Sequence, residues 1–99
     1  MTEIEKGHIV RALAGREKGR IFVVIEDPQG DFLLIADGKS RKMESPKKKK
    51  IKHTVFIDEN DTRVGFKIRS GQKVTNADVR RLLSDYSSGR NLQQTLGGI

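Results

Sequence analysis

The first forty residues contain short apolar segments that alternate with glycine-containing turns. Residues 9–13, 21–25 and 32–36 are dominated by β-branched and large apolar side chains, which favour β-strands. Residues 21–25 show no polar alternation, as is typical of a strand buried on both faces or lying inside a closed barrel. Strands this closely spaced, with no helical segment between them, predict a small antiparallel barrel.

The turns between these segments carry their own signals. Gly15 and Gly19 border a basic loop, and both are expected to need a positive φ angle. Residues 27–30 have proline and glycine where a type I turn prefers them. The pair at residues 37–38, Asp-Gly, is a strong hairpin signal and predicts a fourth strand at residues 39–43.

The second half of the chain predicts two more strands and one helix. Residues 53–57 and 63–69 are expected to be the fifth and sixth strands. Thr75 has the position of a helix N-cap, with an acidic residue three positions later, and the helix is expected to end at residues 87–89. Its apolar stripe has helical spacing and consists of Val79, Leu82, Leu83 and Tyr86.

The net charge of the chain is concentrated in one segment. Residues 39–52 carry eight Lys or Arg side chains against the single acid Glu44, which gives +7 and equals the net charge of all 99 residues. Clustered like charges repel, so this concentration favours a polyanionic partner. Pro46 disfavours helix at the lysines that follow it. We call residues 39–53 the basic strap and predict that it is extended; a solvated flexible run or a localisation signal is the alternative.

The sequence has no pattern typical of an enzyme or a metal site. It contains no cysteine, His8 and His53 are far apart, and no catalytic triad, HExxH or P-loop pattern occurs. The acidic residues at 58–61 lack the glycine and glutamate that a calcium loop requires, and we interpret them as a solvated turn between strands. The phenylalanines lie in apolar segments and are expected in the core. We therefore expect no catalysis, cofactor or metal.

The chain also lacks the signals of a membrane or secreted protein. No segment approaches the about 20 apolar residues that a membrane span requires. The N-terminus, MTEIEKGH, has neither a basic region nor an apolar one. We expect a cytoplasmic protein that is monomeric when free.

The glycine loop lies in a recognisable order of residues. Gly7 and Val10 precede it, and Phe22 and Val24 follow it, which matches the KOW motif. The stretch AGREKGRIFVVI, followed by LLIADGKSRKMESPKKKKIKH, resembles the stand-alone KOW-domain RNA-binding proteins of Gram-positive bacteria. These are relatives of a KOW-bearing large-subunit ribosomal protein of archaea and eukaryotes.

The resemblance implies a fold and a division of the chain. The fold is mainly β: a small SH3-like (KOW) antiparallel barrel with one short C-terminal helix. Residues 1–58 would form the barrel and include the basic strap. Residues 59–89 would be a β/α extension packed on the barrel, and residues 90–99 a flexible tail. The long helical extension of the ribosomal relatives is lacking.

The resemblance and the charge together imply an RNA-binding surface. The partner would be structured RNA, in particular ribosomal RNA of the large subunit, with neighbouring ribosomal proteins as further partners, in the ribosome or its assembly. Gly15 and Gly19 would set the loop geometry. The residues expected to contact phosphates are Arg16, Lys18, Arg20, Lys39, Arg41, Lys42, Lys47, Lys48, Lys49, Lys50, Lys52 and His53.

Two other functions stay open at this stage. The first is a protein-interaction adaptor of the transcription or translation machinery, and the second is binding to duplex DNA. Salt dependence separates RNA binding from adaptor contacts, because apolar contacts lose little affinity as salt rises. If the lysines at 47–50 serve binding alone, changing all four to alanine should leave thermal stability nearly unchanged.

Overall fold

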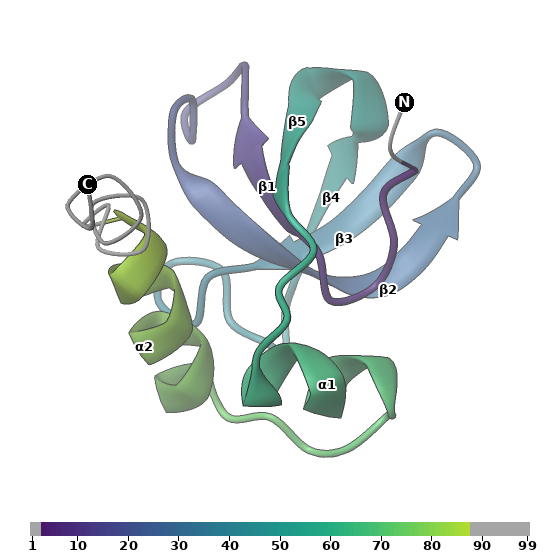
Figure 1. Cartoon of the computed structure of the whole chain (residues 1–99). Helices are drawn as coiled ribbons and strands as arrows, with labels where there is room; N and C mark the ends of the chain where they lie inside the picture. The colour runs from purple at the N-terminus through teal and green to yellow at the C-terminus, as the bar shows by residue number, and fades with distance from the viewer. Residues whose placement is uncertain (1–2, 88–99) are drawn as a thin grey trace, which may run out of the picture.

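The computed structural model describes residues 3–87 of the chain. Five strands, one 3-10 helix and two α-helices follow one another along it (Figure 1). Their bounds are β1 Ile9–Ala12, β2 Ile21–Gln29, β3 Phe32–Ala36, β4 Lys47–Lys50, η1 Ile51–His53, β5 Thr54–Asp58, α1 Arg63–Arg69 and α2 Asn76–Ser87.

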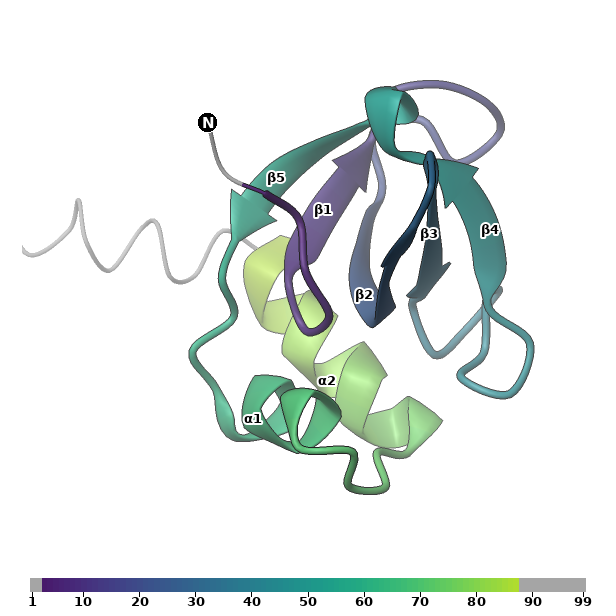
Figure 2. The same ribbon diagram turned by 90° about the vertical axis from the view of Figure 1, so that its right-hand side faces the viewer.

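The strands form one antiparallel sheet in the order β4-β3-β2-β1-β5. The predicted mainly β fold is confirmed, and the arrangement is consistent with an SH3-like barrel. The sheet is not closed, since β4 and β5 are its two edges and the short η1 connects them. Figure 2 shows the strands curving round a common interior, with α1 and α2 together on one side.

The second strand is longer than its apolar core. β2 continues through Asp27 and Pro28 to Gln29, so the turn predicted at residues 27–30 is wrong; the chain turns at Gly30 and Asp31 instead. The pairing with β3 shifts register between Glu26 and Gln29. Such an irregularity accommodates a proline, which has no N–H to donate to the ladder.

The fourth strand begins later than predicted. Residues 39–43 lie in a loop spanning residues 37–46, and β4 begins only at Lys47. The side chain of Asp37 explains the difference. Its Oδ1 accepts the backbone N–H groups of Lys39 (2.9 Å) and Arg41 (2.8 Å), which are then unavailable for strand pairing.

The sixth strand predicted at residues 63–69 is also wrong, because this segment is helix α1. Two α-helices therefore follow the sheet, rather than one. The hydroxyl of Thr62 caps α1 by accepting the N–H of Gly65 at 3.1 Å. Phe66, which we expected in the core, is 59% exposed on this helix.

Helix α2 follows the prediction closely. Thr75 and Asp78 form a reciprocal capping box, with each side chain accepting the other's backbone N–H at 3.1 Å. The apolar stripe faces the sheet, and Tyr86 at its end donates its hydroxyl to Asp58 at 2.6 Å. Burial, followed by this hydrogen bond, raises the pKa of Tyr86 above its usual range. The expected flexible tail lies outside the described residues.

Two apolar clusters hold the fold together, one on each side of the strands. The first packs strand residues such as Ile9 and Val23 against both helices; the second lies within the curved sheet and is centred on Phe22. Neighbours on β1 alternate between them, since Ile9 belongs to the first and Val10 to the second. The expectation that residues 21–25 are buried on both faces is confirmed for its first four residues, and Ile25 is partly buried.

The acidic segment at residues 58–61 is not the solvated turn between strands that we predicted. It connects β5 to α1, and Asn60 within it is fully buried with a φ of 65°. The Nδ2 of Asn60 donates to the Gly7 carbonyl at 2.8 Å, and its Oδ1 accepts the Thr62 hydroxyl at 2.6 Å. A buried amide needs such partners. Asn60 therefore ties the start of β1 to the cap of α1.

Candidate nucleic-acid interface

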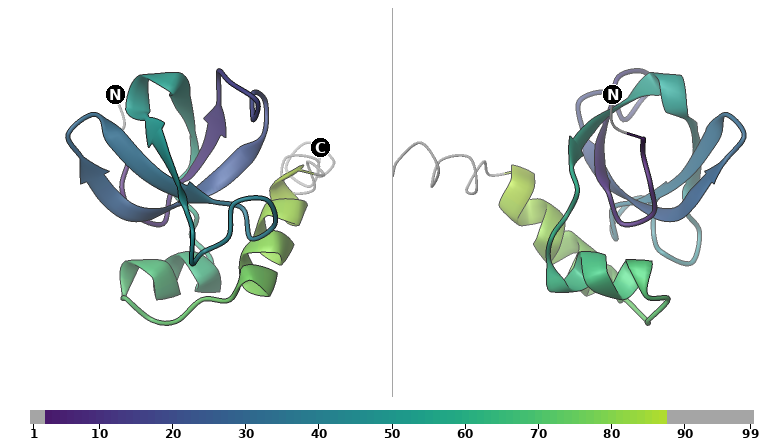
Figure 3. Two further views of the ribbon diagram at one scale, coloured as in Figure 1. Left: turned by 180° about the vertical axis from the view of Figure 1, so that it is seen from behind. Right: turned by 45° about the vertical axis from the view of Figure 1, so that its right-hand side comes forward.

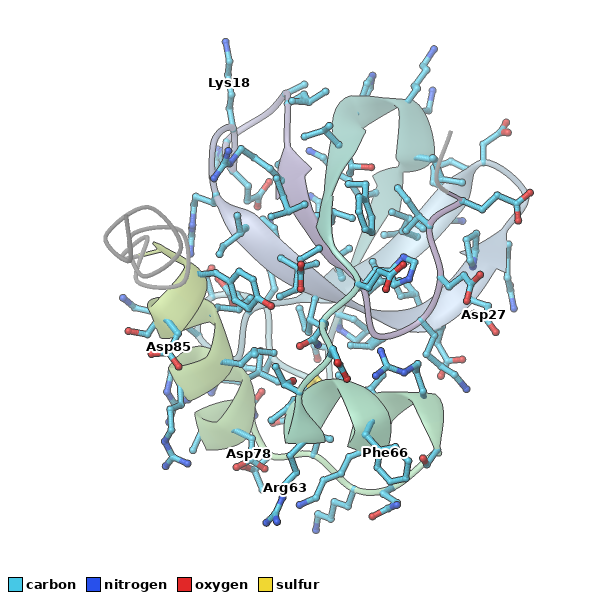
Figure 4. The ribbon with its side chains drawn as sticks, in the orientation of Figure 1. Lys18, Asp27, Arg63, Phe66, Asp78 and Asp85 are labelled. Carbon is cyan, nitrogen blue, oxygen red and sulfur yellow. The ribbon has the colours of Figure 1, made fainter. Side chains whose placement is uncertain are left out.

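The loop between β1 and β2, residues 13–20, has the expected geometry. Gly15 and Gly19 have φ angles of 85° and 88°, which confirms that both need positive φ. Arg16 and Lys18 are exposed, and neither side chain makes a hydrogen bond or ion pair within residues 3–87. Lys18 projects from the tip of the loop, at the opposite end of the molecule from α1 (Figure 4).

A buried acid in this loop was missed at the sequence level. Glu17 is 6% exposed, and its Oε2 accepts Nε and Nη2 of Arg41 at 3.1 and 2.6 Å. The Arg41 hydrogen bonds lower the pKa of Glu17 against the effect of burial, and the charge of Lys47 adds to the lowering. The guanidinium of Arg41 therefore holds the loop at 37–46 against the loop at 13–20.

A second ion pair joins the same two loops. Arg20 donates Nη2 to Asp37 at 2.7 Å and to the hydroxyl of Ser40 at 3.1 Å. Burial alone would raise the pKa of Asp37, but the backbone N–H groups of Arg41 and Lys39, the Ser40 hydroxyl and the Arg20 charge together lower it. Both oxygens of this carboxylate are occupied.

The lysines of β4 alternate between two environments. Lys47 and Lys49 pair with Ile35 and Leu33, which are buried, so these two lysines share the inward face of the strand. Lys49 is 8% exposed, and its Nζ donates to the Ala14 carbonyl in the loop at 13–20, at 2.8 Å.

The other two lysines of β4 lie on the outward face. Lys48 and Lys50 are exposed, and the Nζ of Lys48 lies 4.4 Å from the centroid of the Phe32 ring. The strap is extended at β4 as predicted, but residues 39–46 form a loop and Ile51–His53 a 3-10 helix. The lysines of β4 are not equivalent.

The twelve residues predicted to bind phosphate thus fall into groups. Arg20, Arg41 and Lys49 hold the loops and β4 together through hydrogen bonds. His53 is half-buried in η1, and its carbonyl accepts the N–H of Leu13 at 2.8 Å. Lys47 is half-buried on the inward face of β4. Of the twelve, those that are exposed and make no described side-chain hydrogen bond or ion pair are Arg16, Lys18, Lys39, Lys42, Lys48, Lys50 and Lys52.

The loop at 37–46 is also fixed to helix α2. The side-chain oxygen of Asn76 accepts the N–H of Met43 at 2.8 Å, and its Nδ2 donates to Glu44 at 2.7 Å. The guanidinium of Arg80 donates to the Gly38 carbonyl at 2.6 Å. Seen from behind, this loop lies beside α2 (Figure 3, left). The sequence pattern of α2 gives no signal of this contact, because Arg80 lies off its apolar stripe.

Residues 3–87 contain no cluster of three or more histidine, aspartate or glutamate side chains that could hold a metal ion. Within the same range, no helix is both long and apolar enough to cross a membrane. The imidazole Nδ1 of His8 accepts the Glu5 N–H at 3.0 Å, and the ring packs edge-on against Phe56.

Neither comparison with known proteins identifies a relative. A scan against protein-family models gives no match, and a search of curated proteins gives none either. The resemblance to KOW-domain proteins therefore stays a prediction.

Proposed function

We propose that this protein is a non-catalytic RNA-binding module. The observation that carries the proposal is the division of its cations: one group fixes the loops and β4, and the other is exposed and makes no side-chain hydrogen bond or ion pair within residues 3–87. When the backbone that carries exposed lysines is already ordered, binding costs less conformational entropy than it would for a flexible run. Neutralising phosphates with these lysines releases counterions, which drives association.

The shape of the protein favours a folded RNA surface over an extended single strand. Single-strand binders combine a basic groove with aromatic side chains on which bases stack. Here Phe22 is buried, the Phe32 ring lies against the Nζ of Lys48, and the exposed Phe66 lies on α1, away from the strap and the loop at 13–20. Folded RNA is recognised mainly by its shape and its phosphates. The resemblance to KOW proteins supports ribosomal RNA of the large subunit, and hence a cytoplasmic location.

The direct test measures binding to a structured RNA hairpin and to duplex DNA of equal length over a series of salt concentrations. We expect tighter binding to RNA, with log affinity falling steeply with log salt. Changing Lys18, Lys42 and Lys52 to glutamine should lower that slope by up to about 2 to 3, on the scale of ~0.7 to 0.9 per phosphate contact. The triple variant changes no described side-chain hydrogen bond.

A control variant removes two positive charges outside the proposed interface. Arg63 on α1 and Lys73 in the connection to α2 are exposed, and both lie outside the strap and the loop at 13–20. Changing both to glutamine should leave the slope nearly unchanged. A flat salt dependence in the wild type would favour an adaptor, and tighter binding to the duplex would favour DNA.

The ribosomal part of the proposal needs a separate measurement. We expect the protein to co-sediment with large ribosomal subunits or their precursors at low salt in a sucrose gradient of cell lysate. Moderate salt should release it, because exposed charges are screened. A protein that stays at the top of the gradient at low salt would contradict the ribosomal assignment.

A further inference from the structure

A groove lies between helix α2, the strands β1 and β2 and the loop at 37–46. Its volume is about 500 Å³, within the approximate 300 to 1,000 Å³ range of small-molecule sites. Ile21 and Leu83, from β2 and α2, line it with apolar surface, and both belong to the cluster between sheet and helices. The groove therefore lies at the junction between α2 and the sheet, two elements whose arrangement is seen in Figure 1.

Four cations from separate segments line this groove. Arg11 comes from β1, Arg20 precedes β2, Lys39 lies in the loop at 37–46, and Arg80 belongs to α2. Among the described residues that line it, Asp37 is the one acid. Four positive charges against one negative charge leave an excess of +3.

The hydrogen-bonding capacity of the single acid, Asp37, is already taken up by donors of the protein. One oxygen of Asp37 accepts two backbone N–H groups, and the other accepts the Arg20 guanidinium and the Ser40 hydroxyl. Its charge is thus neutralised within the protein. An anion entering the groove would meet the remaining positive charge.

Two of the guanidinium groups are held in position before any ligand arrives. Arg80 donates Nη1 to the Gly38 carbonyl, and Arg20 donates Nη2 to Asp37. A guanidinium has five N–H donors, so each keeps donors for a ligand. The side chains of Arg11 and Lys39 make no hydrogen bond or ion pair within residues 3–87 and are free to move onto an anion.

We propose that this groove binds a phosphate group of the RNA backbone and extends the interface from the strap onto α2. The arginines that line the groove suit a phosphate, because a guanidinium group can donate two parallel hydrogen bonds to phosphate oxygens. The site involves Arg11 and Arg80, which lie outside the strap and outside the loop at 13–20. The assignment to RNA rests on the proposed function, whereas phosphate binding by the groove can be tested without RNA.

The first experiment titrates the ¹⁵N-labelled protein with inorganic phosphate at low salt and follows the backbone amide signals. We expect shifts to concentrate at residues lining the groove, such as Gly19, Lys39 and Ser84. Arg11→Gln combined with Lys39→Gln should abolish most of that response. Arg63→Gln combined with Lys73→Gln removes the same charge elsewhere and should leave it intact. Shifts spread evenly over all lysines, or equal effects of the two double variants, would overturn the site.

The second experiment measures binding of the structured RNA hairpin by the same variants. The Arg11 and Lys39 double variant should lower the slope of log affinity against log salt by up to about 1.8, and the control should not change it. A wild type that binds no RNA while its groove still responds to phosphate refutes the proposed function and leaves the groove as a free-anion site. RNA binding that is unchanged in the groove variant refutes the assignment to RNA.

Discussion

The inward and outward faces of β4 both carry lysines, but these lysines have different environments. On the inward face, Lys49 is buried and donates to the Ala14 carbonyl, and Lys47 lies close enough to Glu17 to lower its pKa. On the outward face, Lys48 and Lys50 are exposed. A run of identical residues is uniform in sequence, but the two-residue period of a strand divides it into a structural half and an exposed half. Counting charge overstates what such a run offers to a partner.

The largest stability effect should come from the inward face. Lys49→Ala leaves the Ala14 carbonyl without its donor, so we expect the free energy of unfolding to fall by about 1 to 3 kcal/mol. Lys50→Ala is the matched outward variant and should change it by less than about 0.5 kcal/mol. Urea unfolding of both variants checks the difference. Equal losses would show that the two faces are not distinct.

This result also bears on the four-lysine variant. From the sequence alone, changing residues 47–50 together to alanine is expected to leave stability unchanged. With Lys49 buried, we now expect a loss dominated by that one position. A stable four-lysine variant would restore the simpler interpretation of the strap.

The next largest effect on stability concerns Glu17, which lies near Lys47 of the inward face. The Arg41 hydrogen bonds, aided by the charge of Lys47, lower the folded-state pKa of Glu17, so ionised Glu17 stabilises the fold. This contribution is fully present above the unfolded pKa, about 4.3, and is lost as pH falls through the lowered folded value. Glu17→Gln should cost about 1 to 2 kcal/mol at pH 7. It should also reduce the loss of stability on acidification.

Urea unfolding at a series of pH values from neutral to acid measures this difference. Asp37 also has a lowered pKa, so the variant should keep part of the acid sensitivity. Wild type and variant that lose stability in parallel below pH 5 would contradict the role given to Glu17.

A smaller effect isolates the backbone of the loop that Lys49 holds. A Cβ added at Gly19 would meet nothing within 4 Å, so Gly19→Ala changes only the backbone preference at a φ of 88°. We expect a loss of about 1 kcal/mol, measured by thermal or urea unfolding. At Gly38 an added Cβ would also collide with the Asn76 carbonyl, and Gly38→Ala should cost more. A larger loss at Gly19 than at Gly38 would contradict this account.

Where the sequence predicted the fold correctly, one local signal dominated. The strands near residues 9–12 and 32–36 are short apolar runs bounded by turns, and the apolar stripe of α2 has helical spacing. The apolar residues of the segment at 63–69 fit two spacings, that of a strand and that of a helix. Val64, Phe66 and Ile68 alternate as in a strand, while Val64 and Ile68 are also spaced as in a helix. The helix is selected by the hydroxyl of Thr62, which accepts the N–H of Gly65, and by the packing of Ile68.

The interface was predictable in its charge but not in its pairing. The positions of the basic residues are visible in the sequence, as are the two glycines of the loop. The pairing of Glu17 with Arg41 spans 24 residues, and that of Lys49 with Ala14 spans 35. Contacts at such separation depend on the curvature of the sheet, which brings β4 close to the loop at 13–20. An acid within a basic loop, such as Glu17, is the signal that marks this kind of anchor.

The outward face should give the smallest stability effect and a clear binding effect. Lys48→Ala combined with Lys50→Ala removes two exposed charges and one cation–π contact, so we expect unfolding to change by less than about 1 kcal/mol. The slope of log affinity against log salt for the RNA hairpin should fall by about 1.4 to 1.8, because each phosphate contact contributes ~0.7 to 0.9. Lys49→Ala, measured well below its unfolding transition, should leave that slope unchanged. We thus expect Lys49→Ala to change stability but not the salt dependence of binding, and the Lys48 and Lys50 double variant to do the reverse. If Lys49→Ala lowers the slope as much as the outward pair does, the inward lysine reaches the RNA and β4 presents all its charge to one partner.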